Sequence, residues 1–196
     1  MQDLRVVING AGAAGIAIAK LLMKQGVKDI VLLDSYSANY EGRDNLNPMK
    51  EEIAKKTNKR KIKGGLREAL VCADVFVGVS KADLVDEDMI RSMNEGPIIF
   101  AMANPVPEIM PDLALKAGAA IVGTGRSDFP NQINNALVFP GIFRGLLDGR
   151  LKKVTYEMKV KAAIAIAYSV KPAKDKLLPL VTDKKVVKAI SKTLNS

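Results

Sequence analysis

The chain has 196 residues, of which 48% are hydrophobic and 26% charged, and its formal net charge is +9. This composition is typical of a globular domain, and no apolar run reaches the roughly 20 residues that a bilayer-spanning helix needs. The absence of histidine excludes Ser-His-Asp triads and histidine-ligated metals within the chain, and the single cysteine excludes an internal disulfide.

Apolar, β-rich runs alternate with helix-like stretches through the first three quarters of the chain. We expect strands at 5–10, 29–34, 74–80, 97–103 and 120–125. We expect helices at 13–25, 48–57, 66–73, 86–93 and 112–119, and a stretch over 131–150 that begins as a loop and ends helical. From residue 155 onward the pattern is helical and lysine-rich.

The predicted strands contain few polar residues, as expected for strands buried on both faces, and helical crossovers between strands imply a parallel sheet. The sequence therefore predicts a Rossmann-type α/β fold, a doubly wound, mostly parallel sheet with helices on both faces and a helical C-terminal tail. We expect a dinucleotide-binding domain over residues 1–150. We expect residues 151–196 to form a helical extension that packs on this domain or on a missing N-terminal domain.

Three glycines, Gly10, Gly12 and Gly15, join the first predicted strand to the first predicted helix. In a dinucleotide-binding turn the first glycine permits the tight turn, the second lets the backbone approach a pyrophosphate, and the third allows close packing of helix on strand. Asp34 lies 19 residues past Gly15 at the end of the second strand, where it can accept hydrogen bonds from the adenosine ribose and favours NAD over NADP. The alternative is a tight turn with a capping aspartate.

Other polar residues follow later strands, at the edge where open α/β sheets bind ligands. Asn104 follows the fourth strand in ANPVPE, and Ser80 or Lys81 follows the third. A solvated turn explains these residues equally well. The string NQINN holds a cluster of amides, which can orient a polar substrate or can cap the following helix. The members of this cluster are Asn131, Gln132, Asn134 and Asn135.

Cys72 lies in the apolar stretch ALVCADVFVGV, which predicts a buried, unreactive thiol. The lysines are mixed with acids over most of the chain, so we interpret the excess positive charge as a solvated surface and expect neither nucleic-acid nor membrane binding. Met1 leads straight into a strand, so we expect no signal peptide and a cytoplasmic protein.

Several segments in order resemble the NAD(P)-binding domain of prokaryotic malic enzyme, the decarboxylating malate oxidoreductase. The resemblance covers about residues 3 to 170, and its segments are INGAGAAGIAIAKLL, LLDSYSANYEGRDNLNPMKEEIA, FVGVSKADLV, IFAMANPVPEI and GTGRSDFPNQINNALVFPGIFRG. The resemblance implies oxidation of malate with NAD or NADP and Mg²⁺ or Mn²⁺, followed by decarboxylation to pyruvate and CO₂. It also implies a homo-oligomer when the enzyme is complete.

By this resemblance, Gly12, Ala13 and Ala14 match the pyrophosphate loop, and Asp34 and Ser35 match ribose contacts. The residues that match substrate-binding asparagines are Asn104 and Asn135, with Asn134 adjacent. The family's lysine base, tyrosine acid and metal-binding carboxylates lie in motifs before the glycine loop. No residue of this chain matches them, so we expect no catalytic residue and no metal ligand here, and an isolated chain that is inactive.

Two other functions remain open from the sequence. One is the NAD-binding domain of another amino-acid or hydroxy-acid dehydrogenase, because such enzymes share the glycine loop. The other is a non-enzymatic nucleotide-binding module on the same fold. The choice between NAD and NADP also stays open, because Lys50, Lys55 and Lys56 follow Asp34 in the next predicted helix.

Overall fold

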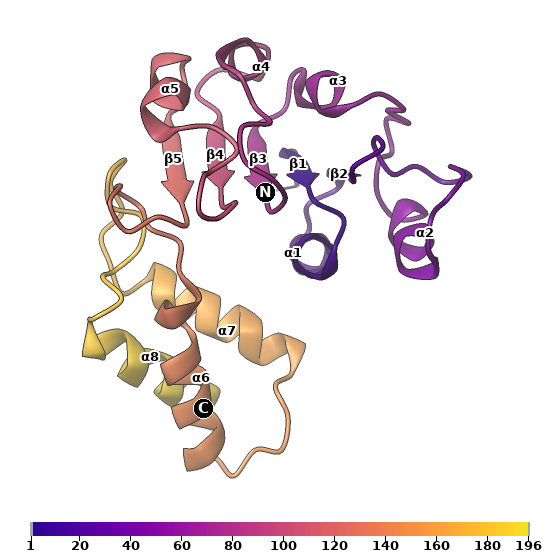
Figure 1. The fold of residues 1–196 in the computed structure, drawn as a ribbon. Coiled ribbons are helices and arrows are strands. Elements are labelled where there is room, and N and C mark those ends of the chain that lie inside the picture. The colour runs from indigo at the N-terminus through magenta and orange to yellow at the C-terminus, as the bar shows by residue number, and fades with distance from the viewer. Residues whose placement is uncertain (1, 196) are drawn as a thin grey trace. The chain divides into compact units, whose positions relative to one another are not determined.

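The computed structural model describes residues 2–195, and the chain divides into two compact units between Arg126 and Ser127 (Figure 1). The first unit is built on a five-stranded sheet in the order β2-β1-β3-β4-β5, and every neighbouring pair of strands is parallel. The strands are β1 (Arg5–Asn9), β2 (Asp29–Leu33), β3 (Val75–Gly78), β4 (Ile98–Ala101) and β5 (Ile121–Thr124). The predicted Rossmann-type fold is confirmed.

Helices cover both faces of this sheet because alternate residues of each strand point to opposite sides. On β1, Val6 and Ile8 pack with residues of α1 and α2, whereas Val7 packs on the other face with residues of α3, α4 and α5. Figure 1 shows α3, α4 and α5 on one side of the sheet and α1 on the other. The helices are α1 (Ala13–Lys24), α2 (Pro48–Ala54), α3 (Leu66–Leu70), α4 (Glu87–Arg91) and α5 (Pro111–Lys116).

The ends of these helices follow local sequence signals. Gly26 follows α1 with a φ of +91°, a conformation that glycine adopts without strain. Asn47 caps α2, since its side chain accepts a hydrogen bond of 2.9 Å from the backbone N–H of Lys50, and Pro48 occupies the first helical position. The cap places Lys50 in the first turn of α2.

The prediction for Cys72 is wrong. The helix α3 ends at Leu70, two residues before the cysteine, so Cys72 falls in the turn that leads to β3 and is exposed. Its backbone adopts a φ of +57°, and its N–H donates a 2.9 Å hydrogen bond to the carbonyl of Ser92. The apolar stretch that surrounds the cysteine in sequence therefore does not bury its thiol.

The second unit is helical, with a short 3₁₀ turn, η1 (Asn135–Leu137), and three helices, α6 (Phe139–Asp148), α7 (Tyr156–Ala167) and α8 (Lys184–Leu194). Its core includes Ala162 of α7 and Ile190 of α8. The helix α6 approaches α8 closely through Gly141 and Gly145, where an added Cβ would overlap Ile190 and Leu194.

The division between the units falls earlier than the sequence predicted. We expected the boundary at 150/151 because the helical pattern becomes lysine-rich only after the segment that forms α6. That boundary would separate α6 from α7 and α8. In the structure α6 belongs with these later helices, since its glycines pack against α8. Among the described residues, no helix is long and apolar enough to cross a membrane.

Candidate functional site

The first unit has a cavity of about 590 Å³ at the carboxyl edge of its sheet. The cavity lies above β1, which has β2 on one side and β3 on the other. The strand order therefore reverses direction at this point of the sheet. Ligands of open α/β sheets bind at this switch point, and the volume is in the range of small-molecule and cofactor sites. Residues that line the cavity include Asn9, Gly10, Ala11, Gly12, Asp34, Ser35, Tyr36, Ser37, Asn47, Lys50, Ser80, Lys81 and Leu84.

The glycine loop forms one wall of the cavity. Gly10 has a φ of +124°, and its N–H donates a 2.9 Å hydrogen bond to the carbonyl of Leu33. Gly15 is buried, and an added Cβ there would overlap the carbonyl oxygen of Gly10. A Cβ at Gly12 would meet no atom within 4 Å, so this glycine leaves open space beside the backbone. The three glycines thus occupy a turn with positive φ, an open position and a packed position, an arrangement that suits a dinucleotide turn.

The helix α1 begins directly after this loop. Gly12 is its N-cap and offers no side-chain hydrogen bond, and there is no acidic residue in the first turn. The first N–H groups of a helix lack intrahelical partners, and the helix dipole places a partial positive charge there. Gly10, Ala11 and Gly12 line the cavity beside this end, so the wall suits a phosphate group.

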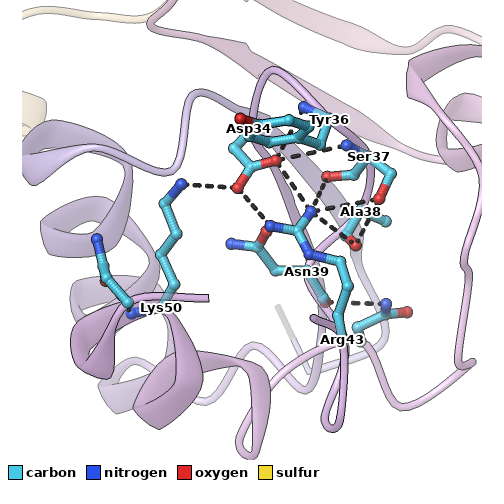
Figure 2. A network of polar contacts seen from close by, with 9 residues as sticks. Asp34, Tyr36, Ser37, Ala38, Asn39, Arg43 and Lys50 are labelled. Atoms are coloured by element: carbon cyan, nitrogen blue, oxygen red, sulfur yellow. Dashed lines mark hydrogen bonds and ion pairs between the residues drawn. The ribbon is translucent and has the colours of Figure 1, made fainter. Parts of the chain in front are cut away.

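Asp34, immediately after β2, is the centre of a polar network (Figure 2). Arg43 binds the carboxylate through two hydrogen bonds, from Nη1 to Oδ1 at 2.9 Å and from Nη2 to Oδ2 at 2.5 Å. The Lys50 ammonium group lies 2.7 Å from Oδ2, and the backbone N–H groups of Tyr36 and Ser37 donate to Oδ1 at 3.0 and 3.4 Å. The carboxylate of Asp34 therefore has five donors.

This network sets the charge of the cavity wall. The side chains of Asp34 and Arg43 are only 6% and 7% exposed, and that of Lys50 is 20% exposed. Burial alone raises the pKa of Asp34, but the hydrogen bonds from Arg43, Lys50 and the two backbone N–H groups outweigh burial and hold the pKa well below its ordinary value. Asp34 is thus ionised at neutral pH, and with its two cations the cluster carries a net charge of +1.

Ser80 lies in the loop after β3, on the opposite side of β1 from Asp34, and lines the cavity there. The side-chain amide of Asn9, the last residue of β1, donates a 2.8 Å hydrogen bond to the Ser80 hydroxyl. The backbone N–H of Val79 donates to the carbonyl of Asn9 at 2.9 Å. These bonds tie the end of β1 to the loop after β3, next to the glycine loop.

The structure brings together five of the predicted cofactor-binding residues on one cavity, namely Gly10, Gly12, Asp34, Ser35 and Ser80. Ala13 and Ala14 form the exposed start of α1, and Gly15 packs beneath the loop. Asn104 is exposed in the loop after β4 and does not line the cavity. The roles assigned to these residues stay predictions.

The asparagines of the NQINN string lie in the second unit. Asn134 caps η1, accepting a 2.9 Å hydrogen bond from the backbone N–H of Ala136, and Asn135 is exposed. Asn131 has a structural role, since its side chain binds the carbonyl of Lys174 and the N–H of Leu177, both at 2.8 Å. The capping alternative considered for this string is thus realised at Asn134, which does not exclude substrate binding.

Sequence reasoning missed Arg43, Asn9 and Tyr36 as members of the site. Arg43 lies in an irregular loop, where no periodicity relates a residue to the end of a strand. Of the three lysines considered beside Asp34, only Lys50 reaches it; Lys55 and Lys56 pair instead with Glu51 and Glu52, at 3.1 and 2.8 Å. Within residues 2–195, no cluster of three or more cysteine, aspartate and glutamate side chains lies close enough to hold a metal ion.

A parallel sheet in this order, a glycine turn at its switch point and an acid after the neighbouring strand define a Rossmann-type dinucleotide-binding domain. The family model described as "Malic enzyme, NAD binding domain" matches residues 1–194. The chain belongs to this family of malic enzyme NAD-binding domains.

Three relatives illustrate the match. The chain is 54% identical to the bifunctional malic/malolactic enzyme of Bacillus subtilis (strain 168), over 99% of this chain and 48% of that protein. It is 48% identical to the NADP-dependent malic enzyme of Rhizobium meliloti (strain 1021), over 85% of this chain and 22% of that protein. The crystal structure of an NAD-dependent malic enzyme from Thermotoga maritima superposes with a TM-score of 0.96 at 43% identity, covering 100% of this chain and 52% of that one.

The chain therefore spans about half the length, or less, of the relatives that it matches. Both NAD- and NADP-dependent malic enzymes are among them.

Proposed function

We propose that the chain is the part of a malic enzyme that binds NAD or NADP, in an enzyme that oxidises malate and decarboxylates the product to pyruvate and CO₂. The observation that carries this proposal is the coincidence of the family match over residues 1–194 with a cavity built from a glycine loop and a buried acid. When bound, the nicotinamide group accepts the hydride from the malate carbon.

The residues of the cavity have defined tasks in this proposal. The backbone around Gly10 and Gly12, with the start of α1 at Ala13 and Ala14, holds the pyrophosphate. Asp34 and Ser35 bind the adenosine ribose. Asp34 accepts a ribose hydroxyl in exchange for one of its present donors, and Lys50 is the most exposed of the cations that bind it.

The loops after β3 and β4, which carry Ser80 and Asn104, take the nicotinamide half of the dinucleotide. Asn104 also serves the substrate, together with Asn134 and Asn135, as the resemblance to the family implies. Amides suit this task because they bind a carboxylate or a hydroxyl without exchanging protons with it.

The groups that move protons and hold a divalent metal belong, in this proposal, to parts of the enzyme outside this chain. The resemblance to the family supports that assignment, because its lysine, tyrosine and carboxylate motifs match no residue of this chain. In this proposal the residues of this chain position the dinucleotide and the substrate.

For the choice of cofactor, we propose that the site prefers NAD and also accepts NADP. An unpaired aspartate would repel a 2′-phosphate, but Asp34 is already neutralised by Arg43 and Lys50. Lys50 is the flexible cation of the cluster, able to turn from Asp34 to a 2′-phosphate.

The helical unit presents an apolar stripe on α6. Phe139, Phe143 and Leu147 recur every four residues, are 49%, 59% and 73% exposed, and the two rings stack at 5.9 Å. A stripe of this kind marks an interaction site. We propose that this stripe packs against the part of the enzyme outside this chain.

We also propose that the complete enzyme is a cytoplasmic homo-oligomer.

The substrate assignment is tested by substrate screening with the full-length enzyme and with this chain alone. We expect the full-length enzyme to reduce NAD with malate, and the chain alone to give no turnover. Turnover with glutamate or shikimate in place of malate would show that the chain serves another dehydrogenase. Robust malate oxidation by the isolated chain would show that its catalytic groups lie within residues 1–196.

A further inference from the structure

Glu108 is a buried carboxylate for which the proposed chemistry has no use. It follows Pro107 in the loop after β4, and it is 0% exposed. Within the described residues it has no ion-pair partner. A carboxylate without a cation is costly to bury unless hydrogen bonds compensate, so its contacts explain why the position holds an acid.

The two carboxyl oxygens of Glu108 bind two different loops. Oε1 accepts a 3.1 Å hydrogen bond from the backbone N–H of Ser80, just after β3, and Oε2 accepts a 3.0 Å bond from the N–H of Ala103, just after β4. The backbone carbonyl of Glu108 also accepts a 3.0 Å bond from Val85. One side chain thus fixes the spacing between the ends of two neighbouring strands.

The carboxyl group of Glu108 lies directly against Gly78, the last residue of β3. A Cβ added to Gly78 would overlap the carboxyl carbon and both oxygens of Glu108. The glycine is therefore required by the position of Glu108 and not by its own backbone conformation. The carboxyl group of Glu108 thus fills the space that a side chain at position 78 would need.

Both loops that Glu108 holds lead to predicted site residues. Ser80 lines the cavity and is bound by Asn9, and Asn104 directly follows Ala103. The glycine loop and Asp34 form the part of the rim that suits the adenosine and the pyrophosphate. The loops after β3 and β4 lie beyond the switch point, on the side that is left for the nicotinamide half.

We propose that Glu108 is a positioning residue that sets the nicotinamide side of the site by holding the backbone N–H groups of Ser80 and Ala103 at a fixed separation. The inference rests on the proposed dinucleotide binding. It predicts that Glu108 affects the affinity for the whole dinucleotide and leaves the affinity for its adenosine half unchanged.

The test compares NAD and ADP binding by isothermal titration in the wild-type chain and in Glu108→Gln. Glutamine keeps the shape but turns an NH₂ donor toward one N–H, so one of the two bonds is lost. We expect the Kd for NAD to rise about tenfold, which corresponds to about 1.4 kcal/mol, because the two loops are no longer held together, with the Kd for ADP unchanged. Gly78→Ala, which displaces the carboxyl group from the other side, should have the same selective effect.

The control is Asp86→Asn, which also removes a carboxylate that accepts a backbone N–H bond, here from Met89 at 2.9 Å, at a residue that does not line the cavity. Its affinities for NAD and ADP should match those of the wild type. Equal weakening of NAD and ADP binding in Glu108→Gln, or no weakening of either, would overturn the proposal. A wild-type chain that binds neither ligand would contradict the proposed function instead.

A second measurement does not depend on the folding of any variant. In amide-resolved NMR spectra of the wild-type chain, NAD should shift the Ser80 and Ala103 resonances, and ADP should leave them in place. If NAD binds and neither resonance moves, the two loops do not border the nicotinamide half and Glu108 has no positioning role.

Discussion

Arg43 binds Asp34 with both of its terminal nitrogens, at 2.9 and 2.5 Å, and the two side chains are 7% and 6% exposed. Asp34 is therefore held in one orientation before any ligand arrives. Because the fork of an arginine matches a carboxylate in geometry, a lysine at position 43 would not reproduce this contact.

Arg43→Met should destabilise the first unit. Removing one partner of a buried ion pair leaves the other charge poorly compensated, so we expect the free energy of unfolding to fall by about 3 kcal/mol. Urea denaturation measures the change. The matched control is Arg67→Met: Arg67 also pairs with an aspartate, Asp86, but both side chains are about half exposed, so the loss should stay within about 1 kcal/mol. Equal losses in the two variants would contradict the structural role of Arg43.

Acid should weaken the folded state through Asp34. The pKa of this group is lower in the folded than in the unfolded chain, so its stabilising effect is complete above the unfolded pKa and is lost as the pH falls. We expect the free energy of unfolding to decline below about pH 4. In Asp34→Asn the decline should be shallower, since an amide does not titrate. Denaturation curves at a series of pH values check this, and identical slopes would contradict it.

Two glycines of the same loop should respond differently to the same substitution. Gly15→Ala places a methyl group against the carbonyl of Gly10 and should destabilise the chain by about 2 kcal/mol or more. Gly12→Ala should leave the stability nearly unchanged, because Gly12 has open space and a φ of −90°. It should instead weaken NAD binding about tenfold or more, by keeping the pyrophosphate from the backbone. Thermal melts and NAD titrations of both variants measure these effects, and a reversed pattern would exclude the proposed loop roles.

Parts of the site could be predicted from the sequence, and other parts could not. The glycine turn and Asp34 were predictable because strand, turn and helix follow one another along the chain and carry their own signals. Arg43 and Glu108 were not, because each lies in an irregular loop and meets its partners only after the sheet has formed. Cys72 was placed wrongly because the apolar pattern runs on past the end of α3.

The unit boundary has a similar explanation. Hydrophobic periodicity predicted α6 as a helix but carried no information on its partner. Its assignment to the second unit depends on Gly141 and Gly145, which let α8 approach. A glycine inside a helix signals close packing only once the neighbouring helix is known.

Lys50→Met should change the choice between the two cofactors. The 2′-phosphate of NADP would lose a charge-assisted contact, so its affinity should fall about tenfold, whereas NAD affinity should change about twofold or less. The control is Lys56→Met, just after the end of α2. Lys56 pairs with Glu52 and does not line the cavity, so its loss should change neither affinity. If NAD and NADP weaken in parallel in Lys50→Met, Lys50 does not meet the 2′-phosphate.

The central claim is that this chain by itself binds the dinucleotide at the glycine loop. Isothermal titration of the wild-type chain with NAD tests it most directly. We predict saturable binding of one NAD per chain, with a dissociation constant below about 1 mM, equivalent to about −4 kcal/mol. A titration that shows no saturable binding of either NAD or NADP at several times that concentration would contradict the account.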